Sequence, residues 1–546
     1  MMRIKIFIVI ITLLFINDNS LAGSLYISPD GNDNNTGSID SPYATIKKAH
    51  DAAQPGDTLY LRGGTYYPFQ QTVFSKKGES GNYFVICSFP GEVPVIDGAN
   101  VTEGNTNQGS TPTWKFKNAK YWKIIGPIII TNGRGAGIMI DSGDSFEFDQ
   151  IESCYNGKRA ARAAHGFMIW TGSNILFKNC DAHHNANHLW KSGEDQGSNQ
   201  YQHGDGWRVF AGTSNIVFEG CRAWNNLDDN YDFYGADTPI KLINSWSAYA
   251  GRDDSLGTIT GTPNRDMPLV DHRDIPALWG NGIKLGYFED NVSHRVERCL
   301  SWGNNAAGFH MNLGPSYIIN SVSYSNKAFG FDYLDGNKHE MHNSWEFSNN
   351  YANVDYAEVP PDLNLCSYNS WDNKINIFVD ENDFVELDDC GMLDSRQPDG
   401  SLPVTSFLHL QEGSDLVDSG TDVGLSYLGN APDIGAFESE YTATDLEGNN
   451  DESLPDDLKL IGYPNPFNSG TQIVYNLKES GFVNLRVFDV IGRIVIDLKN
   501  EYQTAGTHKV YWNARGLNDN EISSGIYFVR VFSKNTYQTY KLMFLK

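Results

Sequence analysis

The stretch Asn174-Ile175-Leu176-Phe177-Lys178-Asn179-Cys180 returns as Asn215-Ile216-Val217-Phe218-Glu219-Gly220-Cys221. In both copies apolar and polar residues alternate, which is typical of a strand that buries one face. Weaker copies occupy 240–245, 295–299, 317–321 and 342–344. Self-similarity over this much of a 546-residue chain indicates a repeat architecture whose units are strands.

A second series of short strands follows the first, and each member places an apolar residue after Gly or Asn. The members centre on Phe167, Trp207, Tyr231, Ile283, Phe309 and Phe331. The spacings Trp207 to Tyr231, Ile283 to Phe309 and Phe309 to Phe331 are 24, 26 and 22 residues. A period in this range suits one coil of a parallel β-helix, with equivalent positions about 4.8 Å apart. Leucine-rich repeats have a similar period, but their Leu pattern is absent from the sequence.

Asn and Cys residues recur with the repeat. An Asn stands five residues after the Cys or Ser that ends several copies, and these side chains predict a hydrogen-bonded ladder: Asn185, Asn226, Asn304, Asn326 and Asn349. Four of the seven cysteines fall at matching places and predict stacked buried thiols: Cys154, Cys180, Cys221 and Cys299. Cys366 and Cys390 lie outside this register, and the sequence leaves open whether they pair.

Two coils are too long for the period. Phe167 to Trp207 takes 40 residues and Tyr231 to Ile283 takes 52. The surplus predicts loops near 182–203 and 250–280, where the walls of a binding site are usually built.

A β-helix needs its open ends covered. Residues 42–53 are typical of an amphipathic helix that covers the N-terminal end, with Ser41 as its N-cap and Ile46, Ala49 and Ala53 on its apolar face. The repeat fades after about residue 350, and 433–438 predict a last strand.

Composition divides the chain into four parts. Arg3, Lys5, an apolar run at 6–16 and Ser20-Leu21-Ala22 predict a cleaved signal peptide over 1–22, with an uncleaved membrane anchor as the alternative. The β-helix is expected over 23–440 and an acidic linker over 441–458. From 459 to 546, alternating strands separated by turn signals predict a small β-sandwich. We expect no stable membrane span, and the net charge of −26 argues against a nucleic-acid partner.

The register also predicts a cluster of charged side chains. The residue after each inward-facing apolar residue must point outward, because side chains alternate along a strand. In three successive coils these outward residues are Arg208, Asp232 and Lys284. Asp205 and Asp229 align one coil apart at the turn that leads into the strand, and Asp228 is beside them.

Four carboxylates this close repel one another unless a hard cation holds them, and Ca²⁺ prefers oxygen ligands. The sequence therefore predicts a Ca²⁺ site at Asp205, Asp228, Asp229 and Asp232, with a run of solvated turn acids as the alternative. Zinc is disfavoured, because no Cys/His set has suitable spacing.

Two basic residues accompany these acids. Lys284 is a candidate proton-abstracting base beside the cation, although an ordinary surface lysine is the commoner case. Arg208 is expected either to bind a substrate carboxylate as a fork or to pair with Asp232.

Several motifs match a known family: Tyr26-Ile-Ser-Pro-Asp-Gly-Asn-Asp, Ser41-Pro-Tyr-Ala-Thr-Ile, His203-Gly-Asp-Gly206, Asp228-Asp229-x-x-Asp232 and Gly280-Asn-Gly-Ile-Lys-Leu-Gly286. With them, residues 25–440 resemble the family 9 polysaccharide lyases, which are right-handed parallel β-helix pectate lyases. The resemblance implies that the four aspartates bind Ca²⁺ and that Lys284 is the catalytic base. The stretch between Asp232 and Lys284 is longer than the family leads us to expect.

Motifs in the C-terminal part match a different family: Tyr463-Pro-Asn-Pro-Phe467, Val490-Ile-Gly-Arg493 and Ser524-Gly-Ile-Tyr527. They resemble the type A sorting domain of the type IX secretion system of Bacteroidetes-like bacteria. The resemblance implies secretion to the cell surface or medium and a partner in the secretion machinery, often with removal of the domain.

Together these expectations describe a secreted, monomeric, Ca²⁺-dependent pectate lyase that cleaves polygalacturonate by β-elimination. A metal could offset locally the repulsion between an acidic chain and an acidic polymer. Free lysine titrates at about 10.4, so a lysine base predicts an alkaline optimum. Three alternatives stay open: a lyase on another uronic polymer such as rhamnogalacturonan, a glycoside hydrolase with a carboxylate pair, and a non-catalytic carbohydrate-binding β-helix.

Overall fold

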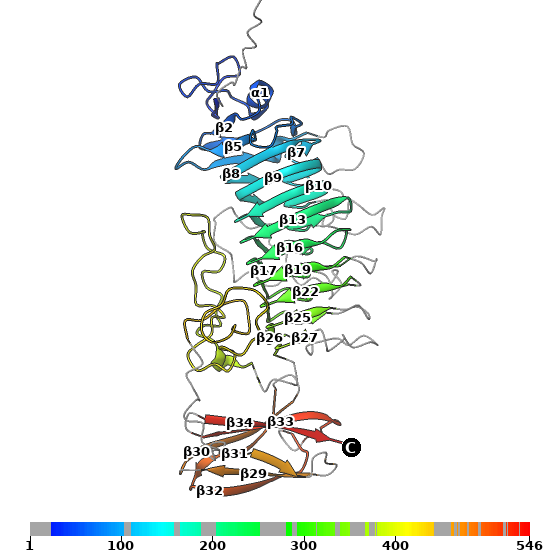
Figure 1. Cartoon of the computed structure of the whole chain (residues 1–546), viewed down its shortest axis with the longest axis vertical. Coiled ribbons are helices and arrows are strands. Elements are labelled where there is room, and N and C mark those ends of the chain that lie inside the picture. The colour runs from blue at the N-terminus through cyan, green and yellow to red at the C-terminus, as the bar shows by residue number, and fades with distance from the viewer. Residues whose placement is uncertain are drawn as a thin grey trace, which may run out of the picture.

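The computed structural model describes residues 23–545 with internal gaps (Figure 1). The segments outside the described residues are 1–22, 103–110, 158–163, 187–203, 252–279, 287–291, 313, 333–338, 350–365, 371–376, 378, 442–459, 464–466, 468–469, 478–479, 490–492, 517–519, 521, 534–535 and 546. The predicted signal peptide, most of both predicted loops and nearly all of the predicted linker lie outside the described residues. Among those described, no helix combines the length and the apolar character that a membrane crossing requires.

A parallel sheet of 27 strands forms a solenoid, as predicted, and its strands stack in three columns (Figure 1). The first column consists of β1 (Ser24–Ile27), β2 (Thr58–Leu61), β5 (Phe84–Ser88), β8 (Lys120–Thr131), β9 (Ile138–Cys154), β10 (Phe167–Lys178), β13 (Thr213–Glu219), β16 (Ile240–Ile243), β19 (His294–Glu297), β22 (Ser316–Ile319), β25 (Glu340–His342) and β27 (Cys366–Ser367).

The second column consists of β3 (Gly64–Tyr66), β6 (Pro94–Asp97), the ends of β8 and β9, β11 (Asp181–His183), β14 (Arg222–Trp224), β17 (Trp246–Ala248), β20 (Leu300–Trp302), β23 (Val322–Tyr324) and β26 (Trp345–Phe347). The third column consists of β4 (Thr72–Phe74), β7 (Trp114–Lys117), the starts of β9 and β10, β12 (Trp207–Val209), β15 (Tyr231–Asp232), β18 (Ile283–Lys284), β21 (Phe309–His310) and β24 (Phe331–Asp332). Long strands β8, β9 and β10 pass through more than one column.

The columns enclose a continuous apolar core in which equivalent residues of neighbouring coils stack. The Phe177 ring stacks on Phe148 at 4.9 Å and on Phe218 at 5.0 Å between centroids, and Phe167 stacks on Trp207 at 3.9 Å. Such aromatic pairs contribute about 0.5–1.5 kcal/mol each beyond the burial of their area. The coil period therefore brings like residues together, and each pair fixes the register of its neighbours.

The predicted Asn ladder is present at the turn between the second and third columns. Asn304 Nδ2 donates to Asn326 Oδ1 at 2.8 Å, and Asn326 Nδ2 donates to Asn349 Oδ1 at 3.0 Å. A second run joins Asn156, Asn185 and Asn226 at 3.0 and 2.9 Å. Asn156 was not among the predicted members of the ladder. Between the runs one coil has Ala250, whose backbone N–H donates to Asn304 Oδ1 at 2.9 Å.

Helix α1 (Ile46–Ala52) lies at the N-terminal end of the coils (Figure 1), and it is shorter than predicted. Its N-cap is Thr45 rather than Ser41, since Thr45 Oγ1 accepts a hydrogen bond from the backbone of Lys48 at 3.2 Å. Asp33 explains the difference, because its carboxylate accepts from the backbone of Ala44 and of Thr45, both at 2.9 Å, just before the helix begins.

The cysteine register is partly wrong. Cys180 and Cys221 align, and Cys299 follows them two coils later with Ser245 in between. Cys154 aligns instead with His183, because it lies at the end of its strand rather than before the second column. All seven cysteines belong to the described residues and all are free, so Cys366 and Cys390 do not pair.

After the coils, the chain from about 379 to 441 folds back against the second column, and we call it the return segment (Figure 1). It contains one short 3-10 helix, η2 (Glu381–Asp383), and a similar turn, η1 (Gly98–Asn100), lies in the early coils. The predicted strand at 433–438 is wrong. Those residues form a buried bend in which the Ile434 N–H donates to Leu416 O at 3.0 Å.

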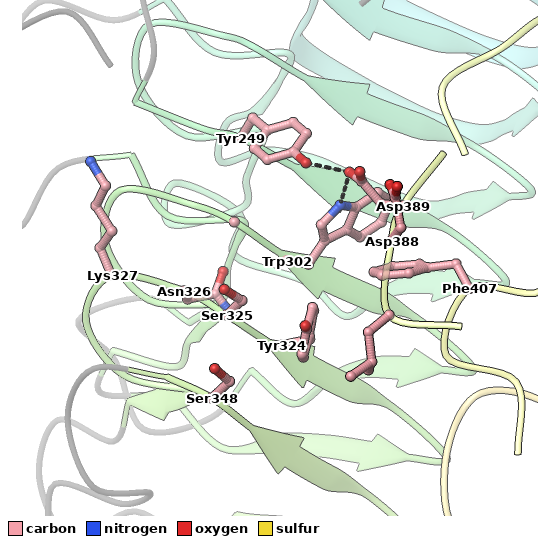
Figure 2. A pocket seen from close by; sticks show the side chains of 12 residues that line it. Tyr249, Trp302, Tyr324, Ser325, Asn326, Lys327, Ser348, Asp388, Asp389 and Phe407 are labelled. Carbon is pink, nitrogen blue, oxygen red and sulfur yellow. Dashed lines mark hydrogen bonds between the residues drawn. The ribbon is translucent and has the colours of Figure 1, made fainter. Parts of the chain in front are cut away.

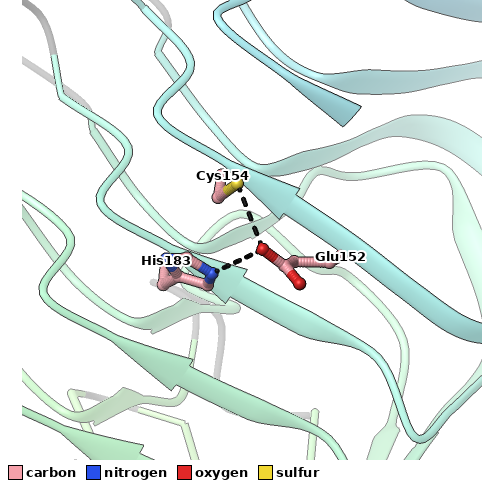
Figure 3. Close-up of side chains that lie close together, drawn as sticks. All are labelled: Glu152, Cys154 and His183. Atoms are coloured by element: carbon pink, nitrogen blue, oxygen red, sulfur yellow. Dashed lines mark hydrogen bonds and ion pairs between the residues drawn. The ribbon is translucent and has the colours of Figure 1, made fainter. Parts of the chain in front are cut away.

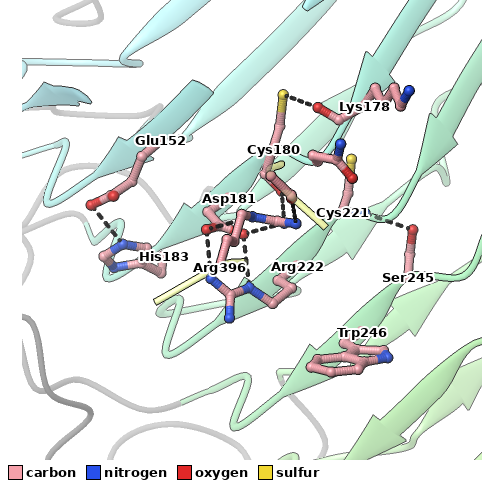
Figure 4. A network of polar contacts seen from close by, with 12 residues as sticks. Glu152, Lys178, Cys180, Asp181, His183, Cys221, Arg222, Ser245, Trp246 and Arg396 are labelled. Atoms are coloured by element: carbon pink, nitrogen blue, oxygen red, sulfur yellow. Dashed lines mark hydrogen bonds and ion pairs between the residues drawn. The ribbon is translucent and has the colours of Figure 1, made fainter. Parts of the chain in front are cut away.

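A buried ionic network fastens the return segment to the coils (Figure 4). Asp181 accepts hydrogen bonds from Arg222 at 2.8 and 3.0 Å and from Arg396 at 2.6 and 3.1 Å. Arg222 also donates to the backbone oxygens of Met392 and Asp394. Burial alone would raise the pKa of Asp181, but the two guanidinium groups outweigh it and hold that pKa far below its usual range.

The C-terminal part forms two antiparallel sheets, as predicted. One contains β28 (Leu460–Tyr463), β29 (Thr471–Leu477) and β32 (Gly506–Trp512), and the other contains β30 (Gly481–Asp489), β31 (Ile494–Gln503), β33 (Gly525–Ser533) and β34 (Thr536–Phe544). Residues of both sheets share one apolar core, which makes the unit a β-sandwich.

Candidate active site

The third column aligns the predicted charged residues in one row. Arg208 is the register partner of Asp232, and Asp232 is the partner of Lys284. His310 and Asp332 continue the row, and their side chains contact each other at 2.6 Å. Strand alternation is therefore sufficient to bring Arg208, Asp232 and Lys284 together from three coils.

Three of the four predicted aspartates form a buried cluster. Asp205, Asp229 and Asp232 each offer a carboxylate oxygen, and these oxygens lie within 4.8 Å of one another. All three residues are fully buried. Asp228 is not part of this trio, but it is close enough for its charge to raise the pKa of Lys284.

Asp229 joins the cluster to the lysine. Its Oδ2 accepts from Lys284 Nζ at 2.9 Å, and its Oδ1 accepts from the backbone and side-chain nitrogens of Asn281 at 2.7 and 2.9 Å. Burial favours the neutral carboxylic acid, but these donors outweigh it and lower the pKa of Asp229. Burial likewise opposes the ammonium of Lys284, yet Asp229, Asp228 and Asp205 raise the pKa of Lys284 well above its ordinary value.

Arg208 lies near one acid of its own coil and one acid of the next coil. Its Nη1 forms an ion pair with Asp232 and lies 3.7 Å from Asp205 Oδ2. The guanidinium also stands 5.0 Å over the Phe210 ring. Of the two roles considered for Arg208, the structure therefore contains the pairing with Asp232. Binding of a substrate carboxylate stays a prediction.

The site contains three residues that the sequence did not predict there. His165 Nδ1 lies 3.2 Å from Asp205 Oδ2, Asn281 holds Asp229, and the Tyr234 ring lies 5.5 Å from Lys284 Nζ. Asn281 belongs to the motif at 280–286, and Tyr234 lies two residues after Asp232, so the sequence offered a signal for both. His165 precedes the coil of Asp205 by 40 residues, and only the stacking of the coils brings it near.

The donor set fits a hard divalent cation. All donors are carboxylate oxygens, which Ca²⁺ prefers. The four aspartates and the two basic residues leave the cluster with two negative charges, which one divalent ion balances. Such an ion would sit among Asp205, Asp229 and Asp232, with Asp228 beside them.

The cavity shown in Figure 2 is a separate feature of about 440 Å³. It lies between the second column and the return segment, and Trp302 Nε1 donates to Asp389 Oδ2 there at 2.8 Å (Figure 2). None of the predicted site residues lines it. We therefore place the candidate site at the third column.

Comparisons with known proteins support the β-helix fold. Pectate lyase L of Dickeya chrysanthemi is 28% identical over 442 residues, which cover 76% of this chain and 90% of that protein. The crystal structure of pectate lyase Pel9A matches with a TM-score of 0.59 at 27% identity, covering 77% of this chain and 97% of that one. A solved rhamnogalacturonan lyase, 20% identical with a TM-score of 0.55, covers 71% of this chain and 97% of its own and shows the fold alone.

Two family models match separate parts of the chain, one in the parallel β-helix and one in the C-terminal β-sandwich. A model described as the secretion system C-terminal sorting domain matches residues 462–545. These similarities make the protein a polysaccharide lyase. The model of the Pel9A-like right-handed β-helix region matches residues 25–353, more than half of the 546 residues, and the chain therefore belongs to this family.

Proposed function

We propose that the protein is a Ca²⁺-dependent pectate lyase that cleaves polygalacturonate by β-elimination. The observation that carries the proposal is the contact of Lys284 Nζ with Asp229, a member of the buried carboxylate trio, at 2.9 Å. The pectate lyases among its relatives support the substrate. We also propose the domain limits that the sequence indicates, with a catalytic unit over 23–440.

The mechanism assigns each residue one task. Asp205, Asp228, Asp229 and Asp232 would hold Ca²⁺, whose Lewis acidity toward a uronate carboxylate would make the proton on C5 more acidic. The aspartates raise the pKa of Lys284, and a bound Ca²⁺ would offset their charge, so Lys284 would lose its own proton at alkaline pH and remove the C5 proton in its neutral form. The electron pair of the C5–H bond forms the C4–C5 double bond, and the 4-O glycosidic bond breaks with its electrons on oxygen. Asp229 accepts from the amine of Lys284 and is itself held by Asn281. Arg208 orients Asp232 and is available to a second uronate carboxylate.

The test is a comparison of two lysine variants. Lys284→Ala removes the base, so we expect kcat to fall by about 10²–10⁴-fold, measured as the near-ultraviolet absorbance of the unsaturated product. Lys241→Ala is the matched control, because Lys241 is exposed on the first column, and it should leave turnover unchanged. Full turnover by Lys284→Ala would contradict the assignment.

The substrate is tested separately on a panel of uronic polymers with and without Ca²⁺. We expect polygalacturonate to give the fastest rise in absorbance, and the alkaline optimum stays a prediction for that reaction. Faster cleavage of rhamnogalacturonan would change the substrate, cleavage without absorbance would indicate a hydrolase, and binding without cleavage would indicate a carbohydrate-binding protein.

We also propose secretion through the type IX system, supported by the sorting-domain match at 462–545. Deletion of 459–546 should leave the purified protein active and should abolish its delivery to the cell surface or medium. Fractionation of cells that carry this secretion system measures the outcome. Delivery that survives the deletion would contradict the proposal.

A further inference from the structure

Three residues of different chemistry meet on the second column, away from the candidate active site: Glu152, Cys154 and His183 (Figure 3). Cys154 and His183 are register partners on β9 and β11, and Glu152 lies two residues before Cys154, on the same face of β9. One ligand atom of each lies within 4.8 Å of the others. Two successive coils therefore contribute a thiol, an imidazole and a carboxylate to one point.

The spacing of these atoms suits tetrahedral coordination. Cys154 Sγ lies 3.4 Å and His183 Nε2 lies 3.2 Å from Glu152 Oε1. In a tetrahedral zinc site the bond lengths require about 3.6 Å between sulfur and oxygen and about 3.4 Å between nitrogen and oxygen. Only small shifts of the side chains are needed to place an ion between them.

The imidazole of His183 is held in the orientation that binding of an ion requires. The ring of His183 stacks on Trp224 at 4.1 Å with planes 15° apart. Its second nitrogen, Nδ1, contacts His184 Nδ1 at 2.6 Å, which leaves Nε2 for the ion. Hydrogen bonding of the far nitrogen is the usual arrangement of a metal-binding histidine.

Access is also suitable. Cys154 and His183 are buried, whereas 36% of the Glu152 side chain is exposed. An ion can therefore enter from solvent past the carboxylate, and a water molecule can complete its coordination.

We propose that Glu152, Cys154 and His183 form a second metal site that binds Zn²⁺ and links the coils of β9 and β11. Thiolate and imidazole select zinc over calcium, whereas the all-oxygen cluster at Asp205, Asp229 and Asp232 has the opposite preference. The two sites therefore differ in the ion that they bind. Sequence spacing disfavoured zinc because Cys154 and His183, 29 residues apart, meet only through the register of β9 and β11. The alternative is a hydrogen-bonded trio without metal, in which the thiol and the imidazole donate to Glu152.

The test uses Co²⁺ as a spectroscopic probe for Zn²⁺ on the full chain, stripped of metal and kept reduced by a phosphine. We expect one equivalent of Co²⁺ to produce a thiolate-to-cobalt charge-transfer band that Zn²⁺ abolishes. Cys154→Ser should lose the band and bind Zn²⁺ at least about 100-fold more weakly, since even outer-shell substitutions cost about 10–100-fold.

Cys390→Ser is the matched control, because Cys390 is the exposed thiol of the seven, and it should keep the band. Glu152→Gln alters a partly exposed side chain and should weaken Zn²⁺ binding, which keeps the proposal testable if Cys154→Ser does not fold. Absence of the band from the unsubstituted protein, or its survival in Cys154→Ser, would overturn the proposal. Neither result depends on the lyase reaction.

Discussion

Asp229 is the residue at which the proposed calcium site and the proposed base meet. It is fully buried, belongs to the carboxylate trio and accepts the hydrogen bond of Lys284. Because one carboxylate serves both groups, a substitution there should affect ion binding as well as turnover.

For Asp229→Asn we expect the stabilisation by Ca²⁺ to disappear, because the neutral amide removes a charged ligand. Ligand at 100 times its Kd stabilises a protein by about 2.7 kcal/mol, so Ca²⁺ should raise the thermal midpoint of the unsubstituted protein and chelation should reverse this. Thermal unfolding with Ca²⁺ or a chelator measures both. Asp332→Asn, farther along the same row, is the control and should keep the shift. An equal shift of the thermal midpoint in Asp229→Asn would show that Asp229 does not bind Ca²⁺.

At the scale of single elements, the Asn ladder shows what stabilises the turns of the coils. Asn326 is buried, donates to Ser301 O, Ser323 Oγ and Asn349 Oδ1, and accepts from the backbone and side chain of Asn304. The side chain thus satisfies polar groups of three coils at once.

Asn326→Ala should lower the free energy of unfolding by at least about 1–3 kcal/mol, because it leaves buried donors and acceptors without partners. Denaturant titration followed by circular dichroism gives the value. Asn305→Ala removes a partly buried contact with Lys327 and should cost no more than about 1 kcal/mol. Equal losses in the two variants would show that the ladder adds nothing special.

At the scale of the whole molecule, the return segment is tied to the coils by Asp181. Its two arginine partners come from a neighbouring coil and from a position 215 residues later in the chain. Breaking a buried ionic network costs about 3–5 kcal/mol, since it leaves charges buried without partners.

Asp181→Asn should therefore lower the free energy of unfolding by about 3–5 kcal/mol at pH 7. The pKa of Asp181 is lower in the folded chain than in the unfolded one, where it is about 3.9. Its contribution is thus fully present above about pH 4 and is lost as the pH falls through the folded value. Denaturant titrations at pH 7 and pH 3 should show that the difference in the free energy of unfolding between variant and parent is smaller at pH 3.

Asp51→Asn is the control for this prediction. Asp51 pairs with Lys47 at an exposed position, where such pairs contribute at most about 1 kcal/mol. The role of the network would be contradicted if Asp181→Asn lost as little free energy of unfolding as Asp51→Asn. It would also be contradicted if the loss in Asp181→Asn were the same at pH 7 and pH 3.

Local patterns were enough to find the coils and the row of Arg208, Asp232 and Lys284. Strand alternation and a period in the twenties depend on neighbouring residues, and stacking then repeats each position one coil later. The N-cap at Thr45 was misplaced because the competing acceptor, Asp33, belongs to a different turn. Cys154 was misplaced because long strand β9 crosses more than one column.

The repeat in the sequence determined the solenoid, its apolar stacks and the row of Arg208, Asp232 and Lys284, since each depends on a pattern that recurs within one coil. The contacts of His165 with Asp205, of Cys154 with His183 and of Asp181 with Arg396 were decided only by the folded chain. Each joins residues from coils of irregular length or from the return segment. No local periodicity relates such positions, so only the packing of the whole chain brings their side chains together.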